Sequence, residues 1–165
     1  MSSETLQVEA PPSTLVLRRE KFTEDLAKEG SVMFEDHARE AGHTGNILPD
    51  YSIYVFLEKM GLLRVYTARI DGLIVGYCLF IVSPYLHDKT SLRAMQDALY
   101  VQPAHRGRVS MNLLRYCSES LANEGVRICY QITTVKRDFG KVLKRLGFKL
   151  DQNIYIKHLQ EGRGV

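Results

Sequence analysis

Several common sequence signatures are missing from this chain of 165 residues, and each absence excludes a class of protein. No apolar run is long enough to span a bilayer, so no membrane-spanning helix is expected. The N-terminus is polar and acidic, which predicts that no signal peptide is present. The three cysteines, Cys78, Cys117 and Cys129, lack metal-ligand spacing and cannot all pair. A reducing, cytoplasmic environment is therefore the expected location.

Catalytic and ligand motifs are also scarce. The sequence contains no H-E-x-x-H, no G-x-S-x-G and no P-loop, and no histidines have ligand spacing, so no metal site is expected. A net charge of +3 fits an anionic ligand but does not by itself imply nucleic acid. The length and the 45% hydrophobic content predict one globular domain over residues 14–165, preceded by a flexible N-terminal arm over residues 1–13.

Hydrophobic periodicity predicts an α+β fold. Strands are expected at Thr14–Arg19, Leu63–Ile70, Leu73–Val82, from Leu92 or Met95 to Val101, and at Val126–Thr134, with a closing pair at Phe148–Leu150 and Ile154–His158. Helices are expected at Glu20–Ala41, from an Asp50 cap to about Met60, at Met111–Asn123 and at Phe139–Leu146. The strand–helix–strand unit over residues 92–134 is a crossover that makes its two strands parallel. The remaining sheet is expected to be antiparallel, with helices on both faces.

The segment Leu99–Leu114, LYVQPAHRGRVSMNLL, carries the clearest functional signal. It is typical of a strand, a short turn and the start of a helix. Unpaired N–H groups and the positive end of the dipole make a helix N-terminus a seat for phosphate. Arg106 and Arg108 would add bidentate donors for the same anion. An ordinary basic loop before a surface helix would give the same pattern, so the segment alone leaves both interpretations open.

The element order, the R-G-R turn and the L-G-F near the C-terminus resemble the GCN5-related N-acetyltransferase (GNAT) superfamily. The family's V-x-P-x-x-R-G-x-G-x-G/A stands here as VQPAHRGRVSM, with Val109 and Met111 where small residues are usual. The resemblance implies a GNAT fold, with a twisted sheet of about 6–7 strands that is mostly antiparallel and contains one splayed parallel pair. It also implies acetyl-CoA as the cofactor, with these binding residues: Leu99, Val101, Arg106, Gly107, Arg108, Val109, Ser110, Met111 and Asn112.

Longer pieces, among them FEDHAREAG (34–42) and MQDALYVQPAHRG (95–107), resemble GNAT proteins common in tailed bacteriophages and some bacteria. If the chain is phage-encoded, this resemblance implies that it works in the host cytoplasm. The family implies an amine acceptor on a small molecule or on a protein, and it allows a homodimer, which is frequent among its members. The backbone N–H of Val101 is implied as the group that polarises the thioester carbonyl.

Acetyl transfer requires a base that deprotonates the ammonium. Asp97 is the first candidate, because it lies four residues before Val101 and strand periodicity would put both side chains on one face. A salt bridge with Arg93 or Arg106 would also explain this carboxylate. His87, in the loop that follows a strand, is the second candidate, and a solvent-exposed histidine is its alternative explanation.

Glu35 and His37 lie on the first long helix, where an acidic group would attract a cationic amine. The thiolate also needs a proton donor, and the tyrosine usual in the family is replaced by Leu143. Tyr100 is the candidate replacement, and Tyr130 and Tyr155 are further options.

Two other functions compete with catalysis. The changes at Val109, Met111 and Leu143 would suit a degenerate GNAT-like module that binds a protein without turnover. A basic set could instead bind nucleic acid, but its helical spacing is also that of a plain exposed face, so this alternative ranks last. Its members are Lys136, Arg137, Lys141, Lys144 and Arg145.

Overall fold

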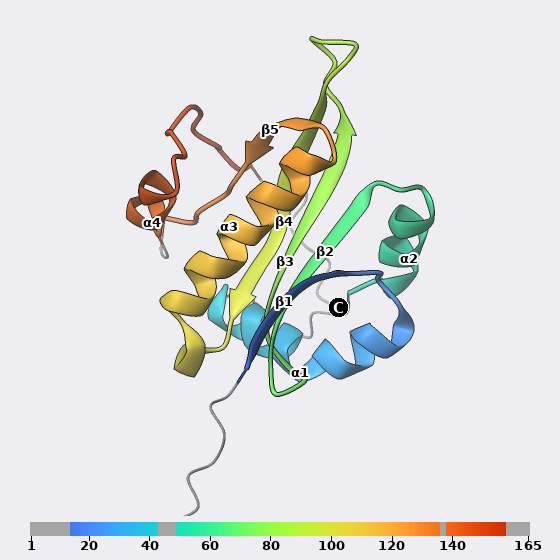
Figure 1. The fold of residues 1–165 in the computed structure, drawn as a ribbon, viewed down its shortest axis with the longest axis vertical. Helices are drawn as coiled ribbons and strands as arrows, with labels where there is room; N and C mark the ends of the chain where they lie inside the picture. Colours follow the sequence, from blue (N-terminus) through green and yellow to red (C-terminus); the bar gives the residue numbers. More distant parts are fainter. Residues whose placement is uncertain (1–13, 43–48, 136–137, 158–165) are drawn as a thin grey trace, which may run out of the picture.

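The computed structural model describes residues 14–42, 49–135 and 138–157. Within them, five strands form one sheet in the order β1-β2-β3-β4-β5 (Figure 1). The strands are β1 (Leu15–Glu20), β2 (Leu63–Ile70), β3 (Leu73–Pro84), β4 (Leu92–Val101) and β5 (Val126–Tyr130). The helices are α1 (Glu24–Glu40), α2 (Tyr51–Lys59), the 3-10 helix η1 (Pro103–His105), α3 (Arg108–Asn123) and α4 (Gly140–Arg145). Neighbouring strands are antiparallel except β4 and β5, which confirms the predicted single parallel pair.

The prediction of six or seven strands is wrong for the described residues. Residues 148–157 form no strand, and Tyr155 is 90% exposed, so the expected closing pair is absent as far as Lys157. A short apolar run becomes a strand only when a neighbour pairs with it, and none is available here. β5 ends at Tyr130 rather than at Thr134. The proposed N-terminal arm lies outside the described residues.

Two apolar clusters lie on opposite faces of the sheet. On one face, α3 packs Val109, Leu113 and Cys117 against Phe80 and other side chains of the central strands, and Figure 1 shows α3 running across that face. On the other face, side chains of α1 and of the segment before it join Tyr77 and Tyr100, with residues of α2 packed against them. Helices therefore cover both faces, as the sequence predicts. In the part of the chain that is described, no helix combines the length and apolar character needed to cross a membrane.

Capping side chains determine where α1 and α2 begin. The hydroxyl of Thr23 accepts from the N–H of Leu26 at 3.2 Å, so α1 starts at Glu24 and not at Glu20, which belongs to β1. The carboxylate of Asp50 accepts from the N–H of Ser52 at 3.0 Å, which confirms Asp50 as the predicted cap.

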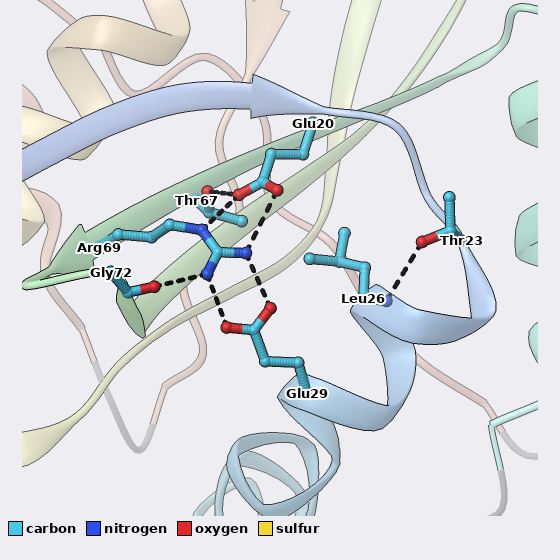
Figure 2. Close-up of polar contacts among 7 residues, drawn as sticks. All are labelled: Glu20, Thr23, Leu26, Glu29, Thr67, Arg69 and Gly72. Carbon is cyan, nitrogen blue, oxygen red and sulfur yellow. Dashed lines mark hydrogen bonds and ion pairs between the residues drawn. The ribbon is translucent and has the colours of Figure 1, made fainter.

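One arginine fastens α1 to the sheet. Figure 2 shows Arg69 of β2 between Glu20 of β1 and Glu29 of α1. Its Nε is 2.8 Å from Glu20, its two terminal nitrogens are 2.6 and 2.9 Å from Glu29, and one of them also donates to the carbonyl of Gly72 at 2.7 Å. With a further contact to Glu20 at 3.2 Å, every N–H of the guanidinium has an acceptor. Arg69 is only 8% exposed, so these contacts compensate for the removal of its charge from water.

Candidate active site

β4 and β5 diverge, and the divergence opens one edge of β4. β3 pairs with β4 along its whole length, from Pro84 opposite Leu92 to Gly76 opposite Val101. β5 pairs with β4 only as far as Met95 opposite Tyr130. At the point of separation, the N–H of Ile132 donates to the side chain of Gln96 at 3.4 Å. Beyond it, β4 has no strand neighbour on that side within the described residues.

The backbone of Val101 faces the open edge. The N–H of Gln102 donates to the carbonyl of Val75 at 2.9 Å and therefore points toward β3. Because successive residues of a strand direct their backbone groups to opposite sides, the N–H and C=O of Val101 point away from β3. The carbonyl of Val101 accepts from Arg106 at 2.8 Å. The N–H of Val101 thus lies where an amide or thioester group of a ligand could reach it.

The chain turns from this edge directly into α3. Gly107, the N-cap of α3, has φ +88°, a backbone conformation that side-chain-bearing residues rarely adopt. No side chain caps this end, and Met111 is the residue whose N–H reaches back to Gly107, at 3.0 Å. The N–H groups of Arg108, Val109 and Ser110 come before this bond, so they have no acceptor within the helix. α3 begins three residues earlier than its predicted start at Met111, because the glycine turns the chain immediately before Arg108.

Val109 and Met111, the two bulky residues of the turn, differ in how deeply they are buried. Val109 is 9% exposed and packs in the cluster with Leu113, so its side chain points into the core and away from the turn. Met111 is half-buried. Among the other predicted cofactor-binding residues, Arg108 is exposed, whereas Leu99, Ser110 and Asn112 are half-buried.

Arg106 has partners that the sequence does not indicate. Its NH2 nitrogen is 2.6 Å from Glu40 at the end of α1, and its guanidinium carbon lies 5.5 Å from the ring centroid of Tyr100. Together with the bond to Val101, these contacts join α1 to the end of β4. The salt bridge between Asp97 and Arg93 or Arg106, the alternative explanation of this carboxylate, is not formed: Arg93 donates to Ser83 at 3.3 Å, and Arg106 donates to Val101 and Glu40.

Asp97 occupies a β-bulge. Leu79 of β3 lies opposite Ala98 and Phe80 lies opposite Gln96, so Asp97 is the extra residue. The bulge interrupts the alternation of side chains along β4. Asp97 and Ala98 both line a cleft beside α1 and α2, whereas Val101 packs on the α3 side. The predicted shared face of Asp97 and Val101 is therefore wrong. Asp97 is exposed.

The cleft beside Asp97, here called the α1/α2 cleft, has a volume of about 280 Å³. Its lining includes five phenylalanine and tyrosine rings beside small and aliphatic residues, with His37 and Asp97 as its ionisable groups other than tyrosine. The rings are those of Phe22, Phe34, Tyr51, Tyr54 and Tyr77. Tyr54 donates its hydroxyl to Asp97 at 3.4 Å. Burial, together with this carboxylate, raises the pKa of Tyr54, so the phenol stays protonated at neutral pH.

His37 enters the cleft from α1. Its Nδ1 is 2.6 Å from the hydroxyl oxygen of Tyr77, and its ring stacks on Tyr100 with centroids 5.3 Å apart. Burial raises the pKa of Tyr77, and burial together with Glu40 raises the pKa of Tyr100, whose hydroxyl donates to Glu40 at 3.4 Å. Helical spacing could have indicated this placement, because His37 lies three residues after Phe34, which faces the same cleft.

The remaining candidates lie elsewhere. Glu35 is exposed and does not line the α1/α2 cleft. His87 is exposed in the β3–β4 connection, where it contacts Tyr85 at 5.3 Å between ring centroids, and it too is outside the cleft lining. Lys136 and Arg137 lie outside the described residues. Among the described residues, no group of three or more His, Cys, Asp and Glu side chains could hold a metal ion.

No protein-family model matches the chain, and no curated protein matches it by sequence. Solved structures do match it. An aminoglycoside acetyltransferase from an uncultured soil metagenomic sample, in complex with sisomicin, aligns with a TM-score of 0.71 and 16% identity over 89% of this chain and 97% of its own. The chain has the GNAT fold. The five-stranded sheet, its diverging parallel pair and the helices on both faces are the elements of that fold.

Two further GNAT structures illustrate the range of relatives by shape. A ribosomal-protein-alanine N-acetyltransferase from Brucella melitensis aligns with a TM-score of 0.68 and 17% identity, over 89% of this chain and all (100%) of its own. A predicted acetyltransferase from Clostridium acetobutylicum, solved with acetyl-CoA, aligns with a TM-score of 0.67 and 16% identity, over 88% of this chain and 96% of its own. The three neighbours described here are named as acetyltransferases, two of them for different substrates, and at 16–17% identity they show the shared fold and no more.

Proposed function

We propose that the chain is an acetyl-CoA-dependent N-acetyltransferase that moves an acetyl group directly to a primary amine of a small molecule or a protein. One observation carries the proposal. The open edge of β4 leads through Gly107 into the uncapped start of α3, so an edge suited to an amide-rich arm adjoins a seat suited to phosphate.

The residues of this edge fit acetyl-CoA. The N–H groups from Arg108 to Ser110 would hold the pyrophosphate, and the exposed Arg108 would add charge. The inward side chain of Val109 leaves these backbone donors uncovered. Leu99 and Val101 would face the pantetheine arm, while Met111 and Asn112 complete the first turns of α3. Arg106 would act by holding the end of β4, since its guanidinium is already bonded to Val101 and Glu40.

Bound acetyl-CoA supplies the thioester. The N–H of Val101 would polarise its carbonyl, and Asp97 would take a proton from the ammonium, since Asp97 is the carboxylate in the α1/α2 cleft. The amine nitrogen then forms a bond to the carbonyl carbon as the C–S bond breaks, and the thiolate receives a proton. Tyr100 is proposed as that donor, because it precedes Val101 at the end of β4 and its phenol is protonated at neutral pH. His87 and Glu35 receive no role.

The resemblance to phage and bacterial GNAT proteins supports a cytoplasmic enzyme, and a homodimer is compatible with it. The test of the function itself is a thermal shift with acetyl-CoA and CoA, followed by a thiol-release assay with a panel of amines. A ligand at one hundred times its dissociation constant should add about 2.7 kcal/mol to the free energy of unfolding. Absence of a shift at millimolar acetyl-CoA would refute the proposal and favour a protein-binding module.

Asp97→Asn separates binding from turnover. This variant should keep the thermal shift with acetyl-CoA and lose acetyl transfer, because the carboxylate acts on the amine and not on the cofactor. Full activity in Asp97→Asn would remove Asp97 from the mechanism while leaving cofactor binding in place.

A further inference from the structure

We infer that the acceptor is a small primary amine with a single positive charge, carried on one flat apolar ring. This inference rests on the proposed function, and it identifies the class of substrate that the α1/α2 cleft would hold.

The walls of the cleft are aromatic rings that hold one another in place. Phe34 meets Tyr77 edge-to-face, with centroids 4.9 Å apart and planes at 72°. Phe22 stacks on Tyr54 at 5.1 Å and 26°, and Tyr51 lies 6.2 Å from Phe22 and 6.4 Å from Phe34. Fixed rings of this kind favour a flat apolar body, and ring faces also attract an ammonium group.

The charge of the cleft matches one ammonium. Asp97 is the carboxylate among its described lining residues, and its described partner is the neutral hydroxyl of Tyr54. Glu40, at the end of the same helix as His37, is already in contact with Arg106 at 2.6 Å. A polycationic acceptor would need several carboxylates to replace the water lost by its ammonium groups. The described lining of the cleft has one carboxylate, and a polycationic acceptor would meet aromatic surface in place of the others.

Size and position agree with a small acceptor. At about 280 Å³, the cleft lies just below the range of roughly 300–1,000 Å³ that is usual for drug-sized ligands. Asp97 belongs to the part of β4 beyond Met95, where β5 no longer pairs. An ammonium bound to Asp97 would therefore lie beside the edge proposed for the thioester, while the ring extends between α1 and α2.

The experiment compares acceptors in the thiol-release assay at fixed acetyl-CoA. The panel holds 2-phenylethylamine, spermidine, an aminoglycoside and a peptide with a free N-terminus. We expect kcat/KM for 2-phenylethylamine to exceed that of the other three at least tenfold. Calorimetric titration should also show that 2-phenylethanol, which lacks the charge, binds at least tenfold more weakly than 2-phenylethylamine.

Matched variants test the aromatic wall and the charge separately. Phe34→Leu should raise KM for 2-phenylethylamine roughly tenfold, because it removes a ring face from the cleft. Phe56→Leu, the same change at an exposed phenylalanine of α2 outside the lining, should leave KM unchanged. Asp97→Asn should weaken binding of the amine and not of 2-phenylethanol, which keeps the inference testable if Phe34→Leu does not fold.

The outcomes distinguish the two proposals. Binding of acetyl-CoA with faster acetylation of the aminoglycoside, spermidine or the peptide would overturn the inference and leave the N-acetyltransferase function standing. Equal effects of Phe34→Leu and Phe56→Leu would also overturn it. Failure to bind acetyl-CoA at all would refute the proposed function instead.

Discussion

Arginine–glutamate contacts fasten α1 at two places, but the two contacts differ in their surroundings. In the first half of the helix, Glu29 meets Arg69, which also holds Glu20 and is almost completely buried (Figure 2). At the C-terminal end, Glu40 meets Arg106, whose side chain is 39% exposed.

The difference indicates that the two contacts of α1 have different roles. Arg69 has an acceptor for every N–H and lies away from the α1/α2 cleft, so we expect it to serve stability. Arg106 touches Val101, Glu40 and the ring of Tyr100, all near the proposed reaction site. Because this pair is partly exposed, we expect it to contribute little to stability and mainly to orient the groups it joins.

The largest effect is expected from Arg69→Met. This change leaves Glu20 and Glu29 without their shared cation, and because Glu29 is partly exposed we expect a cost of at most about 3 kcal/mol, the lower end for a fully buried pair. Urea denaturation should show that loss in the free energy of unfolding, while the folded fraction keeps its affinity for acetyl-CoA. Arg115→Met, at an exposed arginine of α3 with no ion pair among the described residues, is the control. Equal stability of the two variants would contradict the structural role of Arg69.

Acid should weaken the same network, though less than Arg69→Met does. Burial alone would raise the pKa of Glu20, but hydrogen bonds from Arg69 and Thr67 outweigh it and lower that pKa below its ordinary value of 4.5. Since the unfolded chain regains the ordinary pKa, the stabilisation is present above about pH 4.5 and is lost as the pH falls through the lower folded value.

Denaturation between pH 7 and pH 3 tests this dependence on Glu20. The free energy of unfolding should fall more steeply below pH 4.5 for the wild type than for Glu20→Gln, which cannot titrate. Glu119→Gln, at an exposed glutamate of α3, should keep the wild-type slope. If the free energy of unfolding falls equally with pH in the wild type and in Glu20→Gln, another carboxylate controls the loss of stability in acid.

Local signals predicted much of this fold. The Asp50 cap and the Asp71-Gly72 turn between β2 and β3 depend on neighbours in sequence, and both are observed. The bulge at Asp97 depends on how two strands pair, and the contact of Arg106 with Glu40 joins residues 66 positions apart. Neither leaves a local pattern in the sequence. The bulge is the reason why the predicted shared face of Asp97 and Val101 is wrong. The position of His37 is different, because its helical spacing from Phe34 is a local signal that could have placed it in the cleft.

The two ends of α3 allow a matched test of the cofactor turn. Gly107 and Gly125 have φ +88° and +87°, and they lie at the start and just beyond the end of the helix. Alanine at either position should cost about 1 kcal/mol of stability, because both conformations disfavour a side chain. Gly107→Ala should also weaken acetyl-CoA binding in calorimetry, whereas Gly125→Ala should not. If both variants bind acetyl-CoA like the wild type, the start of α3 is not the phosphate seat.

The smallest change in stability is expected where the effect on activity is most specific. Glu40→Gln keeps the shape of the side chain but removes its charge, so Arg106 loses its ion pair and keeps its bond to Val101. A partly exposed pair contributes less than about 1 kcal/mol, so the melting temperature should hardly move. If Arg106 orients the end of β4 toward α1, kcat should still fall severalfold while affinity for acetyl-CoA persists. Asp25→Asn, which breaks the exposed pair with Lys28 at 3.9 Å in the first turn of α1, should leave kcat unchanged. Equal kcat in these two variants would show that the contact of Glu40 with Arg106 only stabilises the fold, like the contact of Glu29 with Arg69.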